Sequence, residues 1–159
     1  MVNCINDCAH YRFMISEYLR DGRSPLPDNE AISRSMRSNK GKNTSPELML
    51  RHALRALGHT VYRLNWKKLP GSPDICFVGK KVAIFVNGCF WHRCPKCKLP
   101  LPKSHVEYWS AKFERNVNRD KANEESLKAA GWTVITIWEC EVLGDLKGIA
   151  EKISNTLNH

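Results

Sequence analysis

Long hydrophobic runs are missing from this 159-residue sequence. No apolar stretch approaches the roughly 20 residues that a helix needs to cross a bilayer. The first residues, MVNCINDCAHYRF, also lack the charged start and apolar segment of a secretory leader. We therefore expect a cytoplasmic protein with no membrane partner. The length is that of one compact domain with a core of its own.

Acidic residues are scarce relative to basic ones, with 16 Asp and Glu against 25 Lys and Arg and a net charge of +9. This balance favours a polyanionic partner, most often duplex nucleic acid, although a basic enzyme without such a partner has the same composition. Residues 33–44 (SRSMRSNKGKNT) hold four basic residues and no acidic one. An arm that contacts phosphates and a solvated flexible linker both fit this segment.

Internal repeats are absent from the sequence, and the predicted elements alternate between helix and strand. Hydrophobic periodicity and turn residues predict helices at 44–57, about 105–130 and about 145–157, and strands at 60–65, 74–78, 82–86 and 132–138. The third strand is apolar throughout, which predicts a central position. The order indicates an α/β fold with a mixed central sheet flanked by helices. Residues 1–32 are expected to be a mobile appendage with an amphipathic stretch at 11–19, and residues 33–159 the functional domain.

Two helices carry apolar residues at helical spacing, and we expect these residues to face the core. They are Leu48, Leu50, Leu54 and Leu57 in the first helix, and Val106, Trp109, Phe113 and Val117 in the long one.

The seven cysteines are not expected to form disulfides in a cytoplasmic chain, which leaves metal binding or free thiols. Cys89, Cys94 and Cys97 cluster within nine residues, and Cys140 follows the last predicted strand. Four thiolates suit a tetrahedral Zn²⁺ site of the structural kind, because no coordination position stays open. Buried free thiols are the alternative, and a redox Cys-x-x-Cys lacks its usual strand–helix context here. Cys4 and Cys8 are interpreted as free thiols in the N-terminal tail.

Pro73-Asp74 opens a predicted strand, and another strand begins eight residues later. In nucleases of the PD-(D/E)xK class, such an Asp binds Mg²⁺, and the next strand supplies an acid and a lysine. Here that strand ends Ile84-Phe85-Val86-Asn87, with neither. The chain therefore departs from the ordinary pattern of that class.

A longer set of motifs surrounds this position. Asn87-Gly88-Cys89-Phe90-Trp91-His92 follows the strand directly, and Asn116-x-x-Arg119-Asp120 and Trp138-Glu139-Cys140 lie downstream. Together with Pro73-Asp74, they closely resemble the very short patch repair (Vsr) endonucleases over roughly residues 33–142. The resemblance implies a restriction-endonuclease-like α/β core in which zinc organises the catalytic loop. Cys94 stands where some members of that family place a His, a change that preserves zinc ligation.

The resemblance also implies a function. The implied protein is a magnesium-dependent DNA endonuclease that nicks one strand 5′ of the thymine in a T:G mismatch. Such a mismatch is the product of 5-methylcytosine deamination. The implied partner is duplex DNA with a T:G mismatch, with functional links to a DNA cytosine-5 methyltransferase and a repair polymerase. The implied location is the bacterial nucleoid. Two other functions stay open: a non-catalytic zinc module that binds DNA, and a restriction-type nuclease of different specificity.

Catalytic roles are carried over by the same resemblance. Asp74 corresponds to the carboxylate that binds Mg²⁺, and Val86 to a residue whose backbone carbonyl is a second ligand. His92 resembles the general base that activates water, which suits a side chain that titrates near neutral pH. Glu47 matches an acidic residue that acts through water on the metal. Asn87 stands where the family often has a His; it can donate a hydrogen bond to phosphate but cannot titrate. The residues alone also allow His92 to be a hydrogen-bonded loop histidine or a zinc ligand.

DNA-binding roles follow in the same way. Phe90, Trp91 and Trp109 resemble a wedge that enters the base stack beside the mismatch, where unstacking costs least. Met36 resembles a residue that probes the minor groove. Core packing is the alternative for the three aromatic residues. The other candidate DNA contacts are Arg34 and Arg37 of the basic segment, and Asn116 and Arg119, which fit a structural network equally well.

Overall fold

The computed structural model describes Pro25 and residues 29–158. Its helices are α2 (Glu30–Ser38), α3 (Ser45–Ala56), α4 (Val106–Ala129), α5 (Glu139–Gly144) and α6 (Leu146–Asn158), with a 3-10 turn at Val78–Lys80. Its strands are β1 (Arg63–Leu64), β2 (Ile75–Phe77), β3 (Val82–Asn87) and β4 (Thr133–Trp138). The expected amphipathic stretch at 11–19, Cys4 and Cys8 lie outside the described residues. None of the helices in the described part is long and apolar enough to cross a membrane.

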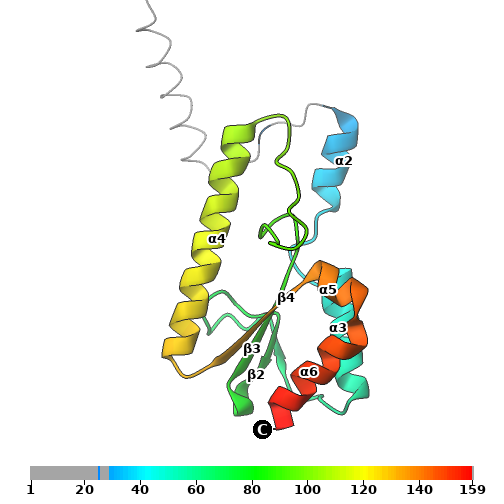
Figure 1. Cartoon of the computed structure of the whole chain (residues 1–159), viewed down its shortest axis with the longest axis vertical. Helices are drawn as coiled ribbons and strands as arrows, with labels where there is room; N and C mark the ends of the chain where they lie inside the picture. The colour runs from blue at the N-terminus through cyan, green and yellow to red at the C-terminus, as the bar shows by residue number, and fades with distance from the viewer. Residues whose placement is uncertain (1–24, 26–28, 159) are drawn as a thin grey trace, which may run out of the picture. The chain divides into compact units, whose positions relative to one another are not determined.

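The four strands form one mixed sheet in the order β1-β2-β3-β4. β1 pairs with β2 and β2 with β3 in antiparallel fashion, whereas β3 and β4 are parallel and α4 connects them (Figure 1). The predicted α/β fold with a mixed sheet flanked by helices is confirmed, and so is the central position of β3. The first two strands are shorter than expected, and α2 and α5 were not predicted. α2 crosses the boundary that the sequence suggested between residues 32 and 33.

Two compact units divide the described chain. One takes in α2 and Pro100–Arg115; the other takes in Lys40–Leu99 and the chain from Asn116 onward, and so holds the whole sheet. In the first unit, Tyr108 and Phe113 of α4 are buried, and Trp109 stacks on Phe113 with their ring centroids 5.6 Å apart. Val106, expected to face the core, is 45% exposed.

The core of the second unit lies on one face of the sheet. Leu50 and Leu54 of α3 pack there with Ile75 and Ile84 of the strands and Ile153 of α6. Within this unit, α3, α5 and α6 gather on that side of the sheet in Figure 1. Because side chains alternate along a strand, the opposite face carries other residues, among them the partly buried Phe85 of β3.

Only half of the apolar positions expected on α3 are buried. Leu50 and Leu54 are inaccessible, whereas Leu48 and Leu57 are 42% and 44% exposed. The expectation was wrong for Leu48 because residues two apart on a helix point about 200° apart, so Leu48 faces away from Leu50. It was wrong for Leu57 because α3 ends before this residue, which is the C-cap. The buried face of α3 includes Glu47 and Arg51 instead. Val117 of α4, 43% exposed, was likewise expected in the core.

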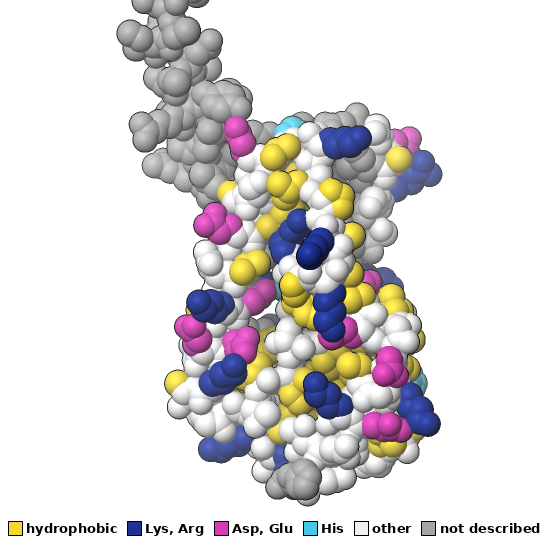
Figure 2. Space-filling model, in the orientation of Figure 1, with side chains coloured by type: hydrophobic (Ala, Val, Ile, Leu, Met, Phe, Trp, Pro, Cys, Tyr) yellow, Lys and Arg dark blue, Asp and Glu magenta, His cyan; other side chains and the backbone are white. Residues whose placement is uncertain are grey.

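On the face shown in Figure 2, the basic side chains do not form a single patch. Over α5 and α6, Lys and Arg side chains are interspersed with Asp and Glu side chains. Ion pairs along the helices, such as Lys147 with Glu151 on α6, account for part of this mixing.

Candidate functional site

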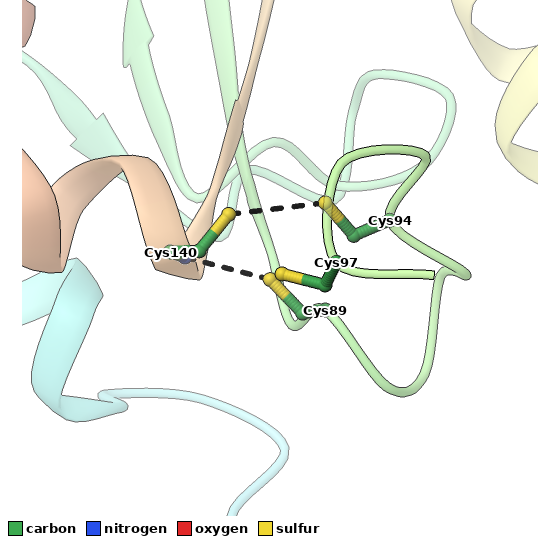
Figure 3. A group of neighbouring side chains, drawn as sticks. All are labelled: Cys89, Cys94, Cys97 and Cys140. Atoms are coloured by element: carbon green, nitrogen blue, oxygen red, sulfur yellow. Dashed lines mark hydrogen bonds between the residues drawn. The ribbon is translucent and has the colours of Figure 1, made fainter. Parts of the chain in front are cut away.

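Four cysteine sulfurs lie within 4.8 Å of one another in the second unit. Cys89, Cys94 and Cys97 belong to the loop after β3, and Cys140 to the first turn of α5, with the four side chains turned toward one another (Figure 3). The sulfurs of Cys94 and Cys140 are 3.8 Å apart. Neighbouring sulfurs of a tetrahedral zinc site, with zinc–sulfur bonds of about 2.3 Å, are also about 3.8 Å apart. This cluster can therefore hold a metal ion such as zinc, as the cysteine spacing predicted.

The parallel pairing of β3 with β4 brings these two segments together. Asn87 is in register with Trp138, so the chain leaves both strands at the same end of the sheet. The backbone N–H of Cys140 then donates to the Cys89 sulfur at 3.4 Å, and the N–H of Cys89 donates to Glu139 Oε2 at 3.3 Å. Sequence positions about fifty residues apart are thus joined directly.

The thiols do not share one acidity. Burial raises the pKa of Cys89, and a hydrogen bond with Cys140 raises that of Cys97. Burial also acts to raise the pKa of Cys94, but hydrogen bonds from the backbone of Cys97 and Lys96 and with the thiols of Cys140 and Cys89 together outweigh it, so the pKa is lowered. Four thiolates at this spacing require the charge of a cation to balance them.

Asp74 lies directly before β2, beside the end of β3. Its Oδ2 atom accepts a hydrogen bond from the backbone N–H of Val86 at 2.8 Å. Burial raises the pKa of this carboxyl to about 6, against the lowering effect of that hydrogen bond. The charge of Glu47 raises the pKa further, while those of Arg51 and His92 lower it. The structure thus brings Asp74, Glu47 and His92 into one electrostatic cluster.

Glu47 lies in the first turn of α3 and is 3% exposed. Its Oε1 atom accepts hydrogen bonds from the hydroxyl of Thr44 at 2.8 Å and from the Thr44 N–H at 3.3 Å. The predicted helix start at Thr44 is thereby confirmed, with Glu47 as the acidic partner of a capping box. Arg51, one turn later, forms an ion pair with Oε2 at 2.7 Å.

His92 lies on the loop of residues 89–97, called the cysteine loop because it carries Cys89, Cys94 and Cys97. The Nδ1 atom of His92 is hydrogen-bonded to Asp120 Oδ2. Asp120 also accepts a hydrogen bond from Arg119 Nη2 at 3.0 Å. Asp120 is therefore held between His92 and Arg119. His92 does not belong to the four-cysteine cluster found among the described residues.

The remaining loop residues are held by local contacts. The rings of Phe90 and Trp91 are half-buried and meet edge to face with centroids 5.1 Å apart. Asn116 Nδ2 donates to the backbone carbonyl of Trp91 at 3.0 Å, which favours the structural network that the sequence left open for this residue. Asn87 is half-buried at the end of β3.

Four predicted DNA contacts belong to the other compact unit. Trp109 is half-buried on α4, and Arg34 and Arg37 are exposed on α2, where Arg37 donates to Ser33 Oγ at 2.7 Å. Met36 lies on the same helix, but its side chain is outside what the structure describes.

Sequence reasoning missed three residues of this site. Arg51 was not singled out, although its spacing of four from Glu47 on a helix is the signal of such a pair. Asp120 was quoted within a motif, but His92 was not identified as its partner. Glu139 was quoted beside Cys140 without a role, and no local pattern indicates its bond to Cys89.

Comparisons with known proteins point to one family. The family model described as DNA mismatch endonuclease Vsr matches residues 26–98. The chain is 43% identical to a "Type II nicking enzyme V.XorIIP" of Xanthomonas oryzae pv. oryzae over 124 residues, which cover 77% of this chain and 89% of the relative. It is 41% identical to the "Type II nicking enzyme V.NaeI" of Lentzea aerocolonigenes, over 87% of this chain and 83% of that one. It is also 32% identical to the "DNA mismatch endonuclease Vsr" of Escherichia coli, with 82% and 83% covered.

The raised pKa of Asp74 predicts a pH-dependent effect of Asp74→Asn on the metal-free protein. Native Asp74 keeps its proton up to about pH 6, whereas an unfolded Asp loses it near 3.8, so its contribution to stability falls as the pH rises through that window. We expect the variant to exceed the unsubstituted protein in free energy of unfolding by up to about 3 kcal/mol at about pH 8, and by less than about 1 kcal/mol at about pH 4. Denaturant titrations at the two pH values measure this. Glu125→Gln, at an exposed position of α4, is the control, and an Asp74→Asn effect independent of pH would contradict the prediction.

Proposed function

Because the chain belongs to the Vsr family of DNA mismatch endonucleases, we propose that it nicks one strand of duplex DNA 5′ of the thymine in a T:G mismatch. Hydrolysis of the phosphodiester bond would leave a 3′-hydroxyl and a 5′-phosphate. The observation that carries the proposal is the convergence of Asp74, at the start of β2, with His92, on the loop after β3. One supplies a carboxylate and the other an imidazole, at the end of the sheet where the cysteine loop begins.

Asp74 and the backbone carbonyl of Val86 are the groups that would hold Mg²⁺. Both offer the hard oxygen atoms that Mg²⁺ prefers, and one carboxylate suffices for an ion that retains water and contacts phosphate. The backbone N–H of Val86 donates to Oδ2 of Asp74, whereas no donor among the described residues bonds to Oδ1. The Oδ1 atom is therefore the one that would bind the ion. A bound Mg²⁺ would supply stabilisation of the charge that develops on the phosphate and on the leaving oxygen.

His92 is proposed as the general base. With the Nδ1 proton directed to Asp120, Nε2 carries the lone pair that can accept a proton from the attacking water. The Asp120 carboxylate fixes the ring and stabilises the imidazolium that forms, and Arg119 holds that carboxylate in turn. Glu47 is proposed to orient water at the ion, and Asn87 to donate a hydrogen bond to phosphate.

The four-cysteine cluster is proposed as a structural zinc site. Its four sulfurs come from the loop and from α5, so one ion would tie the segment that carries His92 to the end of β4. A closed shell of four thiolates leaves no coordination position for substrate.

The DNA contacts are proposed on the same basis. Phe90, Trp91 and Trp109 would enter the base stack beside the mismatch, and Met36 would probe the minor groove. Arg34, Arg37 and Arg119 carry positive charge for phosphate contacts, and residues 33–44 would form an arm along the DNA backbone.

We further propose a restriction-endonuclease-like fold for residues 33–159. The biological context would be the bacterial cytoplasm, with a cytosine-5 methyltransferase that creates the lesion and a polymerase that completes repair.

A second candidate follows from the relatives that are called type II nicking enzymes, to which this chain is 41–43% identical, against 32% for the relative called a mismatch endonuclease. In that case the chain would nick at a restriction-type sequence whether or not a mismatch is present. Matched duplexes that differ only in a T:G, a T:C or a T:A pair separate the two candidates.

Nicking assays with these duplexes test the proposed chemistry. With Mg²⁺ present, we expect cleavage of the T:G duplex only, on the thymine strand. His92→Ala should lower the rate about 10²- to 10⁴-fold, the usual contribution of a positioned general base, and Asp74→Asn should abolish metal-dependent cleavage. Glu125→Gln serves as the unaffected control. Full activity of both site variants would refute the mechanism, and equal cleavage of the T:A duplex would refute the mismatch specificity.

Zinc removal is predicted to unfold the loop, not merely to stop chemistry. Cys94→Ser should lose the bound zinc and destabilise the protein, because metal-binding energy at such sites is folding energy. Cys76→Ala is the matched control, since Cys76 is fully buried in β2 but lies outside the cluster. Zinc content by elemental analysis and thermal melts of the same samples provide the measurement. Retention of one zinc per chain in Cys94→Ser would contradict the assignment.

A further inference from the structure

Arg51 is a charged residue that the proposed mechanism leaves unused. It lies on α3 and is 6% exposed. Its Nη2 atom donates to Glu47 Oε2 at 2.7 Å, and its Nη1 atom donates to Asn43 Oδ1 at 2.8 Å. Its Nε atom is buried and has no hydrogen-bond partner among the described residues. A buried guanidinium is costly even when paired, which calls for a reason beyond packing.

Glu47, the partner of Arg51, has both carboxylate oxygens occupied. Oε1 accepts two hydrogen bonds from Thr44, and Oε2 accepts one from the Asn43 N–H at 2.9 Å besides that from Arg51. All these donors come from the entry to α3 or from its second turn. Glu47 would have to give up several of them to bind an ion directly. Of the two carboxylates, Asp74 and Glu47, Asp74 is therefore the one available to bind an ion directly.

The charges that act on Asp74 come from two elements. Glu47 and Arg51 lie on α3, and His92 lies on the cysteine loop. Without Arg51, the negative charges of Asp74 and Glu47 would act together at the proposed metal position, with only His92 to oppose them. With Arg51, the net charge contributed by α3 at this position is zero, so the ion meets one uncompensated carboxylate.

We propose that Arg51 is a positioning residue of the magnesium site, which holds the Glu47 carboxylate off the ion and offsets its charge. This inference rests on the proposed function, because it assumes a magnesium ion at Asp74. Its consequence is a site that binds Mg²⁺ weakly by itself and acquires the ion together with the phosphate oxygens of DNA. Since Arg51 also bonds the side chain of Asn43, it fixes the chain where residues 33–44 enter α3.

The test is the affinity of the DNA-free protein for Mg²⁺, measured by calorimetric titration. Replacing Arg51 by Met removes a positive charge close to a divalent ion, so we expect Arg51→Met to bind Mg²⁺ roughly tenfold more tightly. Arg51→Lys retains the charge and should stay within about threefold of the unsubstituted protein. The control is Arg55→Met, one turn further along α3, where the exposed guanidinium bonds the Tyr62 hydroxyl at 3.0 Å. Its Mg²⁺ affinity should be unchanged.

A second background keeps the test decisive if Arg51→Met fails to fold with Glu47 left unpaired. Glu47→Gln and the double variant Glu47→Gln/Arg51→Met differ by the same arginine but bury no lone carboxylate at this position. The double variant should bind Mg²⁺ about tenfold more tightly than Glu47→Gln. Equal affinities in the folded proteins, within about twofold, would show a purely structural role and overturn the proposal.

Failure of the inference and failure of the proposed function give different results. If the unsubstituted protein nicks T:G duplexes but the arginine variants bind Mg²⁺ unchanged, only the role of Arg51 is wrong. If the unsubstituted protein neither nicks DNA nor binds Mg²⁺ with a dependence on Asp74, the proposed function fails and this inference with it.

Discussion

The convergence of four cysteine sulfurs at one end of the sheet is the constraint on which the rest of the site depends. Cys140 reaches the loop only because β3 and β4 run parallel and end in register, with Asn87 opposite Trp138. A cation shared by the four sulfurs would fix the course of the loop from Cys89 to Cys97, which includes His92. The shape of this loop would thus be determined by coordination chemistry instead of by the hydrophobic core, which lies on the α3 and α6 side of the sheet.

The second constraint is electrostatic. Asp74 is buried beside Glu47, and both effects raise the pKa of its carboxyl, against the opposing influence of the Val86 N–H, Arg51 and His92. Such a carboxyl is unfavourable as an isolated anion and becomes favourable with a cation next to it. The two proposed metals would therefore have separate roles: zinc on the cysteines would determine the shape of the loop, and magnesium at Asp74, with His92, would serve the proposed cleavage.

Local sequence patterns predicted the parts of this structure that depend on neighbouring residues. The Thr44–Glu47 cap, the apolar strand β3, and the cysteine spacing each carry their own signal, and each is confirmed. Relations between distant residues had no such signal. The bond between His92 and Asp120 joins a loop to a helix residue 28 positions away in the sequence, and no local pattern indicates that pairing.

Amphipathicity was also an incomplete guide. The apolar pattern predicted that Leu48 and Leu57 face the protein core. In the structure both are exposed, and the ion pair of Glu47 and Arg51 is buried instead. A charged pair on a buried face is not visible in a hydrophobic pattern, because the pattern counts apolar residues and not the partners that polar ones find. The roles of the aromatic residues and of the basic segment in DNA binding stay predictions from the family resemblance.

The central claim is that the four cysteines alone bind zinc. His92 is then not a zinc ligand: it is hydrogen-bonded to Asp120 and is available as the proposed general base. X-ray absorption at the zinc edge of the purified full-length protein tests this most directly. The account predicts a first shell of four sulfur atoms at about 2.3 Å and no nitrogen. A shell of three sulfurs and one imidazole nitrogen at about 2.0 Å, lost in His92→Ala, would contradict it, because the proposed base would then be a zinc ligand.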